Sequence, residues 1–117
     1  MKRTLFSVLC IATLATMTSC DTCRVDPLFY LDSPGRTNTA IVFDRDCGPA
    51  GHSTHLSVVS PSTRLGRSGN IAVFDGVTSV DLDWKDDKNL IVTHDATAKV
   101  FLFEKEFSGI RIHEIMR

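Results

Sequence analysis

Hydrophobic and polar residues alternate along much of this chain. The clearest case is the segment 79–85, in which Val80, Leu82 and Trp84 alternate with charged residues. A period of two is typical of a strand with one face in the core and one in solvent. A polar turn over residues 86–89 follows, so we predict that the next apolar run pairs back as a β-hairpin.

A second alternating segment ends at Cys47. Ile41 and Phe43 fall on the same side as Cys47, whereas Asp44 and Asp46 fall on the other side. We predict a half-buried strand here, with the apolar side facing inward and the aspartates facing outward.

The remaining apolar segments are short and are separated by Gly, Pro, Asn and Asp. Residues 100–103 are apolar at every position, which is typical of a central strand. The polar segment 63–70 is predicted to be a loop. The predicted strands are 39–47, 55–60, 70–74, 79–85, 90–94, 100–103 and a last strand with Ile110, Ile112 and Ile115, and residues 25–30 are expected to be extended. The class is therefore all-β, a small antiparallel sandwich or barrel of seven to eight strands.

The N-terminus differs from the rest of the chain. Lys2 and Arg3 precede an uncharged, largely apolar run over residues 4–18. This layout is typical of a secretory signal peptide. The run is shorter than the roughly 20 residues that a membrane-spanning helix needs. A buried N-terminal helix is the alternative, and the charged Asp21 and Arg24 directly after the run disfavour it.

The run ends in Met17-Thr18-Ser19-Cys20, which resembles the lipobox of bacterial lipoproteins, with Met17 in place of the usual Leu. The resemblance implies that the Cys20 thiol receives a diacylglyceryl group carrying fatty acids such as palmitate, and that Cys20 becomes the first residue of the mature chain. Asp21 resembles the mark that retains such proteins in the inner membrane. The implied organisation is a helical signal peptide (1–19) that is cleaved off, a lipid-anchored segment (20–38) and a β-domain (39–117).

The four cysteines are then accounted for. Cys10 leaves with the signal peptide and Cys20 is acylated. Cys23 and Cys47 remain as one pair in an oxidising compartment, so we predict a disulfide between them. Two free thiols are the alternative.

Size and charge limit the possible functions. Removal of residues 1–19 leaves 98 of the 117 residues, which suits one small domain. The 13 basic and 14 acidic residues become 11 and 14 without Lys2 and Arg3, a formal charge of −3. A nucleic-acid-binding protein needs a basic face, so we expect no nucleic acid partner.

No group of residues predicts catalysis, a metal or a cofactor. His52 and His55 are three positions apart, which places them on opposite faces of an extended segment. Strand alternation accounts for the aspartate pairs without a site, and exposed histidines are the simplest expectation. Arg64 and Arg67 lie in the polar loop and could receive an anionic partner, although solvated loop charges are the simpler interpretation.

The predicted function is a small, membrane-anchored envelope lipoprotein with a non-enzymatic binding or accessory role, held at the periplasmic face of the inner membrane. The mature chain also resembles small uncharacterised bacterial secreted proteins, in which a strand ends in Asp-Cys-Gly and a Trp-containing hairpin follows.

One alternative is a lysozyme inhibitor or toxin-immunity protein. The segment 68–74 resembles the Ser-Gly-x-x-Tyr stretch of periplasmic lysozyme inhibitors, with Phe74 where Tyr is expected. The other is a metal-binding or enzymatic periplasmic domain that uses His52, His55 or the aspartates.

Overall fold

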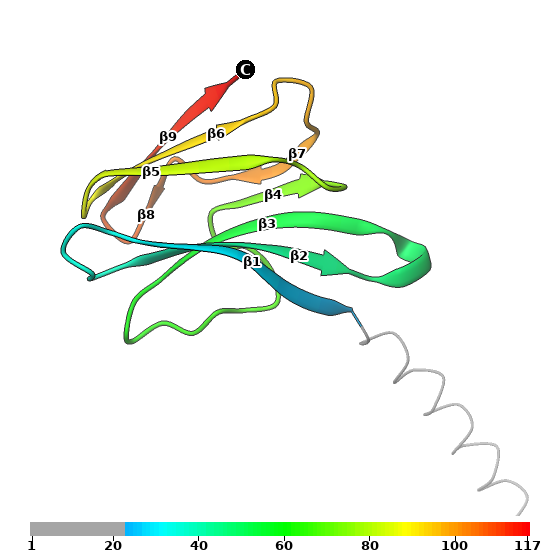
Figure 1. Cartoon of the computed structure of the whole chain (residues 1–117), viewed down its shortest axis with the longest axis horizontal. Helices are drawn as coiled ribbons and strands as arrows, with labels where there is room; N and C mark the ends of the chain where they lie inside the picture. Colours follow the sequence, from blue (N-terminus) through cyan, green and yellow to red (C-terminus); the bar gives the residue numbers. More distant parts are fainter. Residues whose placement is uncertain (1–22) are drawn as a thin grey trace, which may run out of the picture.

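A computed structural model describes residues 23–117. The predicted signal peptide, residues 1–19, and the predicted lipidation residue Cys20 lie outside this range. The described residues form two β-sheets that face each other across a common core (Figure 1). The all-β prediction is therefore confirmed, in the form of a sandwich.

The first sheet has five strands in the order β1-β2-β3-β4-β7, and the second has four in the order β5-β6-β9-β8. All pairs are antiparallel except β6 with β9, which run parallel. The described chain also has a 3₁₀ turn at Gly48–Ala50. The strands are β1 (Arg24–Asp32), β2 (Thr39–Asp46), β3 (His52–Val59), β4 (Ala72–Asp75), β5 (Val80–Asp86), β6 (Asn89–His94), β7 (Val100–Phe103), β8 (Glu106–Phe107) and β9 (Ile110–Met116).

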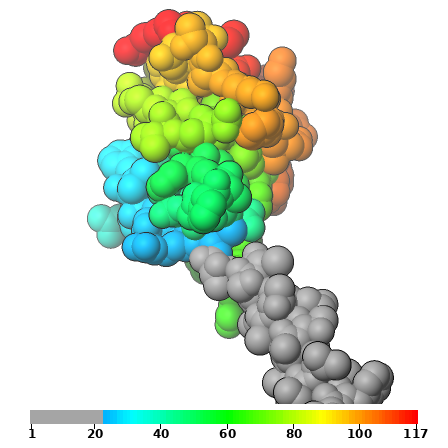
Figure 2. Space-filling model, turned by 90° about the vertical axis from the view of Figure 1, so that its right-hand side faces the viewer, coloured from blue at the N-terminus to red at the C-terminus, as the bar shows by residue number. Residues whose placement is uncertain are grey.

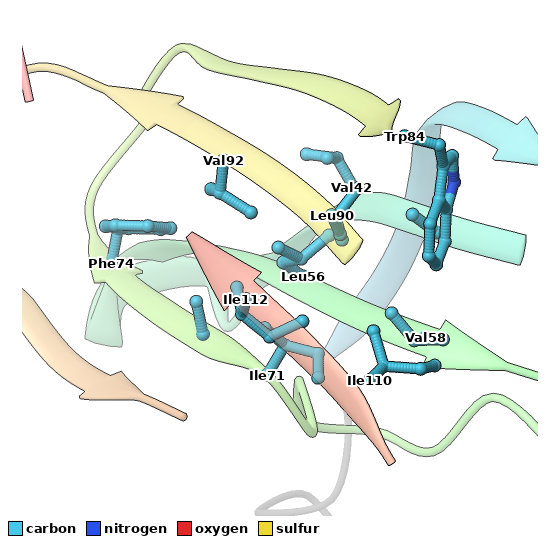
Figure 3. Close-up of a cluster of buried hydrophobic side chains, with 12 residues drawn as sticks. Val42, Leu56, Val58, Ile71, Phe74, Trp84, Leu90, Val92, Ile110 and Ile112 are labelled. Carbon is cyan, nitrogen blue, oxygen red and sulfur yellow. The ribbon is translucent and has the colours of Figure 1, made fainter. Parts of the chain in front are cut away.

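The core lies between the sheets, and both sheets contribute to it (Figure 3). Leu56, Ile71 and Phe74 of the first layer and Leu90 and Val92 of the second are fully buried. Each such side chain contributes about 1.5–3 kcal/mol when it leaves water. The other buried apolar residues of this cluster are Ala40, Val42, Val58, Ala72, Trp84, Ile110 and Ile112.

The hairpin of β5 and β6 follows the predicted pattern. Trp84 is buried, and Val80 and Leu82 pack against the core from the same strand face. The Trp84 indole N–H donates to the Leu31 carbonyl oxygen at 2.9 Å. Because Leu31 belongs to β1, this bond joins the edge strands of the two sheets, and it satisfies the polar atom of a buried aromatic ring.

The predicted orientation of β2 is wrong. Ala40 and Val42 face the core between the sheets, whereas Ile41 and Phe43 are buried on the other face of the strand. Asp44, two positions beyond Val42, lies on the core-facing side and pairs with Thr54 of β3. Alternation could not identify the inner face because four consecutive residues, 40–43, are buried.

Three other features differ from the prediction. β1 pairs with β2 along its length, so the β-fold starts at Arg24 and not at residue 39. β7 lies at an edge of its sheet and not at the centre, with Phe101 exposed. β8 has only two residues and was not predicted, which brings the described strands to nine.

The predicted disulfide is present. Cys23 and Cys47 are bonded, with Cα atoms 4.1 Å apart. The bridge continues the ladder of β1 and β2, because the next pair along is Arg24 with Asp46. The turn after it begins at Gly48, which has φ of 64° and whose N–H donates to the Asp46 carboxylate at 2.8 Å.

Removal of this bridge should lower stability. The bond spans a sequence separation of 24, and closing a loop of that size is worth about 3.5 kcal/mol in the chain-entropy model. We expect the paired substitution Cys23→Ser and Cys47→Ser to lower the free energy of unfolding by about 2–5 kcal/mol. Urea titration followed by Trp84 fluorescence measures this. Reductant should shift the parent to the same midpoint and leave the double variant unchanged; an equal midpoint for both proteins without reductant would contradict the prediction.

Candidate functional site

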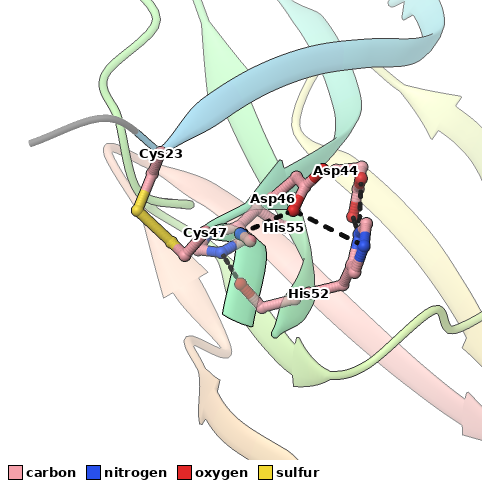
Figure 4. Close-up of a disulfide and its surroundings, with 8 residues drawn as sticks. Cys23, Asp44, Asp46, Cys47, His52 and His55 are labelled. Carbon is pink, nitrogen blue, oxygen red and sulfur yellow. Dashed lines mark hydrogen bonds and ion pairs between the residues drawn. A yellow bond between two sulfur atoms is a disulfide. The ribbon is translucent and has the colours of Figure 1, made fainter. Parts of the chain in front are cut away.

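A charged group lies beside the disulfide, at one end of the first sheet (Figure 4). His52 Nδ1 is 3.0 Å from a carboxylate oxygen of Asp44, and His52 Nε2 is 3.5 Å from one of Asp46. The hydrogen bond with Asp44 raises the pKa of His52, and the charge of Asp46 adds to this effect. Both ring nitrogens thus face carboxylates, which neutralise the charge of the protonated ring.

This group has neither a nucleophile nor the ligands of a metal centre. Among residues 23–117, no three His, Cys, Asp or Glu side chains are arranged to hold a metal ion. His52 and His55 lie on opposite faces of β3, as predicted, because His52 pairs with Asp46 and His55 with Phe43. The structure therefore offers no site for the metal-binding alternative in this part of the chain.

His55 is buried on the outer face of the first sheet, where exposure was expected. Its ring stacks on Phe43 with centroids 5.0 Å apart. The Gly69 N–H donates to Nδ1 at 2.8 Å, and Nε2 lies 2.7 Å from the Ser53 hydroxyl oxygen. Burial lowers the pKa of His55, and the nearby charge of Arg45 lowers it further.

The Ser53–His55 contact resembles a nucleophile beside its base, but the hydrogen bonds assign the opposite roles. Nδ1 accepts from a backbone N–H, so the neutral ring carries its hydrogen on Nε2. That hydrogen is donated to Ser53, and no lone pair remains on Nε2 to take the serine proton. A general base needs that lone pair. His55 therefore fixes the connection between β3 and β4 and does not activate Ser53.

A second buried histidine lies in the second sheet, at the end of β6. The side chain of His94 is 1% exposed, and its Nε2 is 2.7 Å from a carboxylate oxygen of Glu114. Its Nδ1 donates to the Asp95 carbonyl oxygen at 2.9 Å. The ring also packs 4.9 Å from that of Phe74. Both nitrogens thus have partners within the fold, and the pair links β6 to β9 at the margin of the core.

Two hollows open next to Asp95, with volumes of about 330 and 260 Å³, and His94 lines the smaller one. Ser79 and Asp95 line both of them. The linings mix carboxylates with the cations Lys99 and Arg117, so neither hollow selects one sign of charge.

The segment that resembles lysozyme inhibitors is part of the packed fold. Gly69 and Phe74 are buried, and Phe74 lies in the core. The Asn70 side chain accepts from the Val58 N–H and donates to the Val58 carbonyl, so it takes the place of a neighbouring strand. Gly69 and Phe74 are thus part of the packed fold, whereas Ser68 at the start of the segment is exposed. In the same connection, Arg64 and Arg67 are exposed, and Arg67 takes part in an interaction.

The edge strand β1 exposes three large apolar side chains that the sequence did not identify as a surface feature. Leu28, Phe29 and Tyr30 of the edge strand β1 are 60%, 45% and 58% exposed. Phe29 pairs with Val42 on the core-facing side of the sheet and Tyr30 with Ile41 on the outer side, so these residues flank the β1 edge from both faces. We call Leu28, Phe29 and Tyr30 the β1 patch. Their succession after Pro27 is visible in the sequence, but only the edge position of the strand shows that they are exposed.

Comparisons with protein-family models, with curated proteins and with solved structures found no match to this chain. Within residues 23–117, none of the elements is a helix long and apolar enough to cross a membrane.

Gly69 permits a close approach that a side chain would prevent. A Cβ atom there would overlap the Ala72 carbonyl oxygen and lie 2.7 Å from that of Leu56. We expect Gly69→Ala to lower the free energy of unfolding by about 1–3 kcal/mol. Gly66→Ala is the matched control, because the nearest atom to its Cβ would be 3.8 Å away. Urea denaturation of both variants tests this; equal stabilities would show that the connection moves freely.

The two histidines of β3 predict opposite pH dependences. His55 has a pKa lowered from 6.5, so its stabilising contribution is present above pH 6.5 and is lost as the pH falls through its folded pKa. His52 has a raised pKa, so its contribution is complete below pH 6.5 and is lost as the pH rises through its folded pKa.

We therefore expect His55→Gln to flatten the stability profile below pH 6.5, and His52→Gln to flatten it above pH 6.5. Urea unfolding between about pH 5 and 8 measures both slopes. Each variant serves as the control for the other, and a change on the same side of the profile in both would contradict the assignment.

Proposed function

We propose that this chain is a small lipoprotein of the bacterial cell envelope, anchored through Cys20 and without enzymatic activity. The observation that carries the proposal is the Cys23–Cys47 bridge. Because it uses both cysteines beyond Cys20, Cys20 is left as the one thiol of the mature chain available for acylation. A disulfide also persists best in an oxidising compartment, which suits a secreted protein.

The N-terminal sequence supports the same proposal. The basic start, the uncharged run over residues 4–18 and the lipobox-like Met17-Thr18-Ser19-Cys20 form a consistent series. Asp21 favours retention at the inner membrane, on its periplasmic face. A diacylglyceryl group supplies two acyl chains, which anchor a protein stably where one chain alone is marginal.

The described fold supports a binding or accessory role over catalysis. The ring nitrogens of His55 and His94 are occupied by hydrogen bonds that hold neighbouring segments together. The His52 group pairs one imidazole with two carboxylates beside the disulfide. A rigid sandwich held close to an anchor is suited to presenting a surface to another envelope macromolecule.

Acylation is tested by the intact mass of the protein extracted from bacterial membranes. We expect a chain that begins at Cys20 and carries acyl groups, and we expect Cys20→Ala to abolish acylation and release the protein from the membrane fraction. Cys10→Ala is the matched control, since Cys10 leaves with the signal peptide and the variant should mature normally. An unmodified Cys20 in the parent protein would contradict the proposal.

The binding role requires a specific partner. Crosslinking in intact cells, followed by purification in detergent, should recover the same envelope protein from repeated preparations. Failure to recover one would count against a binding role. Inhibition of a lysozyme at micromolar concentration would instead identify the protein as an inhibitor.

A further inference from the structure

We propose that the β1 patch rests on the lipid surface that holds the anchor, so that the first sheet lies with its β1 edge toward the bilayer. This inference depends on the proposed acylation of Cys20. The proposed partner of Leu28, Phe29 and Tyr30 is phospholipid.

A short tether joins the proposed lipid anchor to the fold. Only three residue steps separate Cys20 from Cys23, which span at most about 10 Å when extended. The disulfide ties Cys23 to the end of β2, so the tether ends at a rigid point of the first sheet. Leu28 follows five residues and Tyr30 seven residues along β1, roughly 16 and 23 Å from Cys23. If β1 of the anchored domain lies along the membrane surface, the β1 patch therefore contacts the lipid.

The composition of the patch suits a membrane interface. Leu28 and Phe29 are apolar, and Tyr30 combines an apolar ring with a hydroxyl, a type of side chain that is enriched at the level of the lipid headgroups. The charged residues of the segment 24–36 are Arg24, Asp26, Asp32 and Arg36, whose formal charges cancel. This edge is therefore not repelled by anionic lipid.

The backbone of β1 argues against a strand of another protein as the occupant. Pro27 lacks an N–H, and a register shift lies between Pro27 and Phe29. Prolines and bulges are devices that prevent an edge strand from pairing with another chain. The edge thus exposes apolar side chains, while its backbone is poorly suited to pairing with an added strand. Contact with a lipid surface needs only the side chains and no backbone hydrogen bonds.

The molecular surface agrees with this orientation. The residues of β1, blue to cyan in Figure 2, lie at the margin of the molecule, and the yellow-to-red residues of the second sheet do not cover them. The opposite edge of the first sheet is β7, which is four strand spacings from β1 and so at a distance of about 19 Å. Phe101 of β7 is 57% exposed and provides a matched apolar control on the far edge.

The test places a tryptophan at each edge of the full-length protein. Tyr30→Trp and Phe101→Trp are purified with acylation verified by intact mass, and each is reconstituted into vesicles of phosphatidylethanolamine and phosphatidylcholine, with or without bromine near the headgroup end of the acyl chains. The parent supplies the signal of the buried Trp84. We expect the emission that Tyr30→Trp adds to be largely lost in brominated vesicles, and the emission that Phe101→Trp adds to be kept.

Each other result overturns the inference. An acylated Tyr30→Trp protein that keeps its emission shows that the patch is in water, or is covered by a protein or a second copy, and leaves the proposed function standing. Equal quenching at both edges shows that the domain has no preferred orientation. An unmodified Cys20 overturns both proposals. Leu28→Trp carries the same test if Tyr30→Trp does not fold.

Discussion

The burial of one apolar layer between two sheets is the interaction on which the rest of this structure depends. Neither sheet can remove its core face from water alone, since Leu56 and Phe74 of one are covered by Leu90 and Val92 of the other. The chain passes repeatedly between the sheets, because β5, β6, β8 and β9 lie in one and β7 returns to the other. Separation of the layers would therefore strain the three connections that cross between them, β4–β5, β6–β7 and β7–β8.

Polar side chains complete the fold where this layer ends. Asn70 replaces a missing strand beside Val58, His55 holds the connection that returns from β3, and His94 with Glu114 joins β6 to β9. Each uses a side chain to satisfy atoms that a regular ladder leaves unpaired, and such atoms are costly when they are buried without partners. Histidine at two of these places reflects its two ring nitrogens, each of which can hold a different segment.

The parts of the fold that could be predicted from sequence depend on local pattern. The hairpin around Trp84, the turn at Gly48 and the Cys23–Cys47 pair follow from alternation, backbone preference and cysteine parity. The parts that could not be predicted depend on distant segments. The outer face of β2 is buried in spite of its alternation, and the apolar run of β7 lies at an edge, because neighbours far away in sequence decide both. The exposure of Leu28, Phe29 and Tyr30 likewise depends on which strand ends the sheet.

The parallel pairing of β6 with β9 has a consequence for the order of events during biosynthesis. β9 is an interior strand of the second sheet, yet it is the last strand of the described chain. Until residues 110–116 have been made, β6 lacks one of its two neighbours, and the core lacks Ile110 and Ile112. A two-stranded hairpin is only marginally stable in water. The second sheet therefore cannot assemble progressively from its N-terminal side, and a chain cut before Ile110 is an unfinished surface with exposed core residues, a substrate for proteases and chaperones.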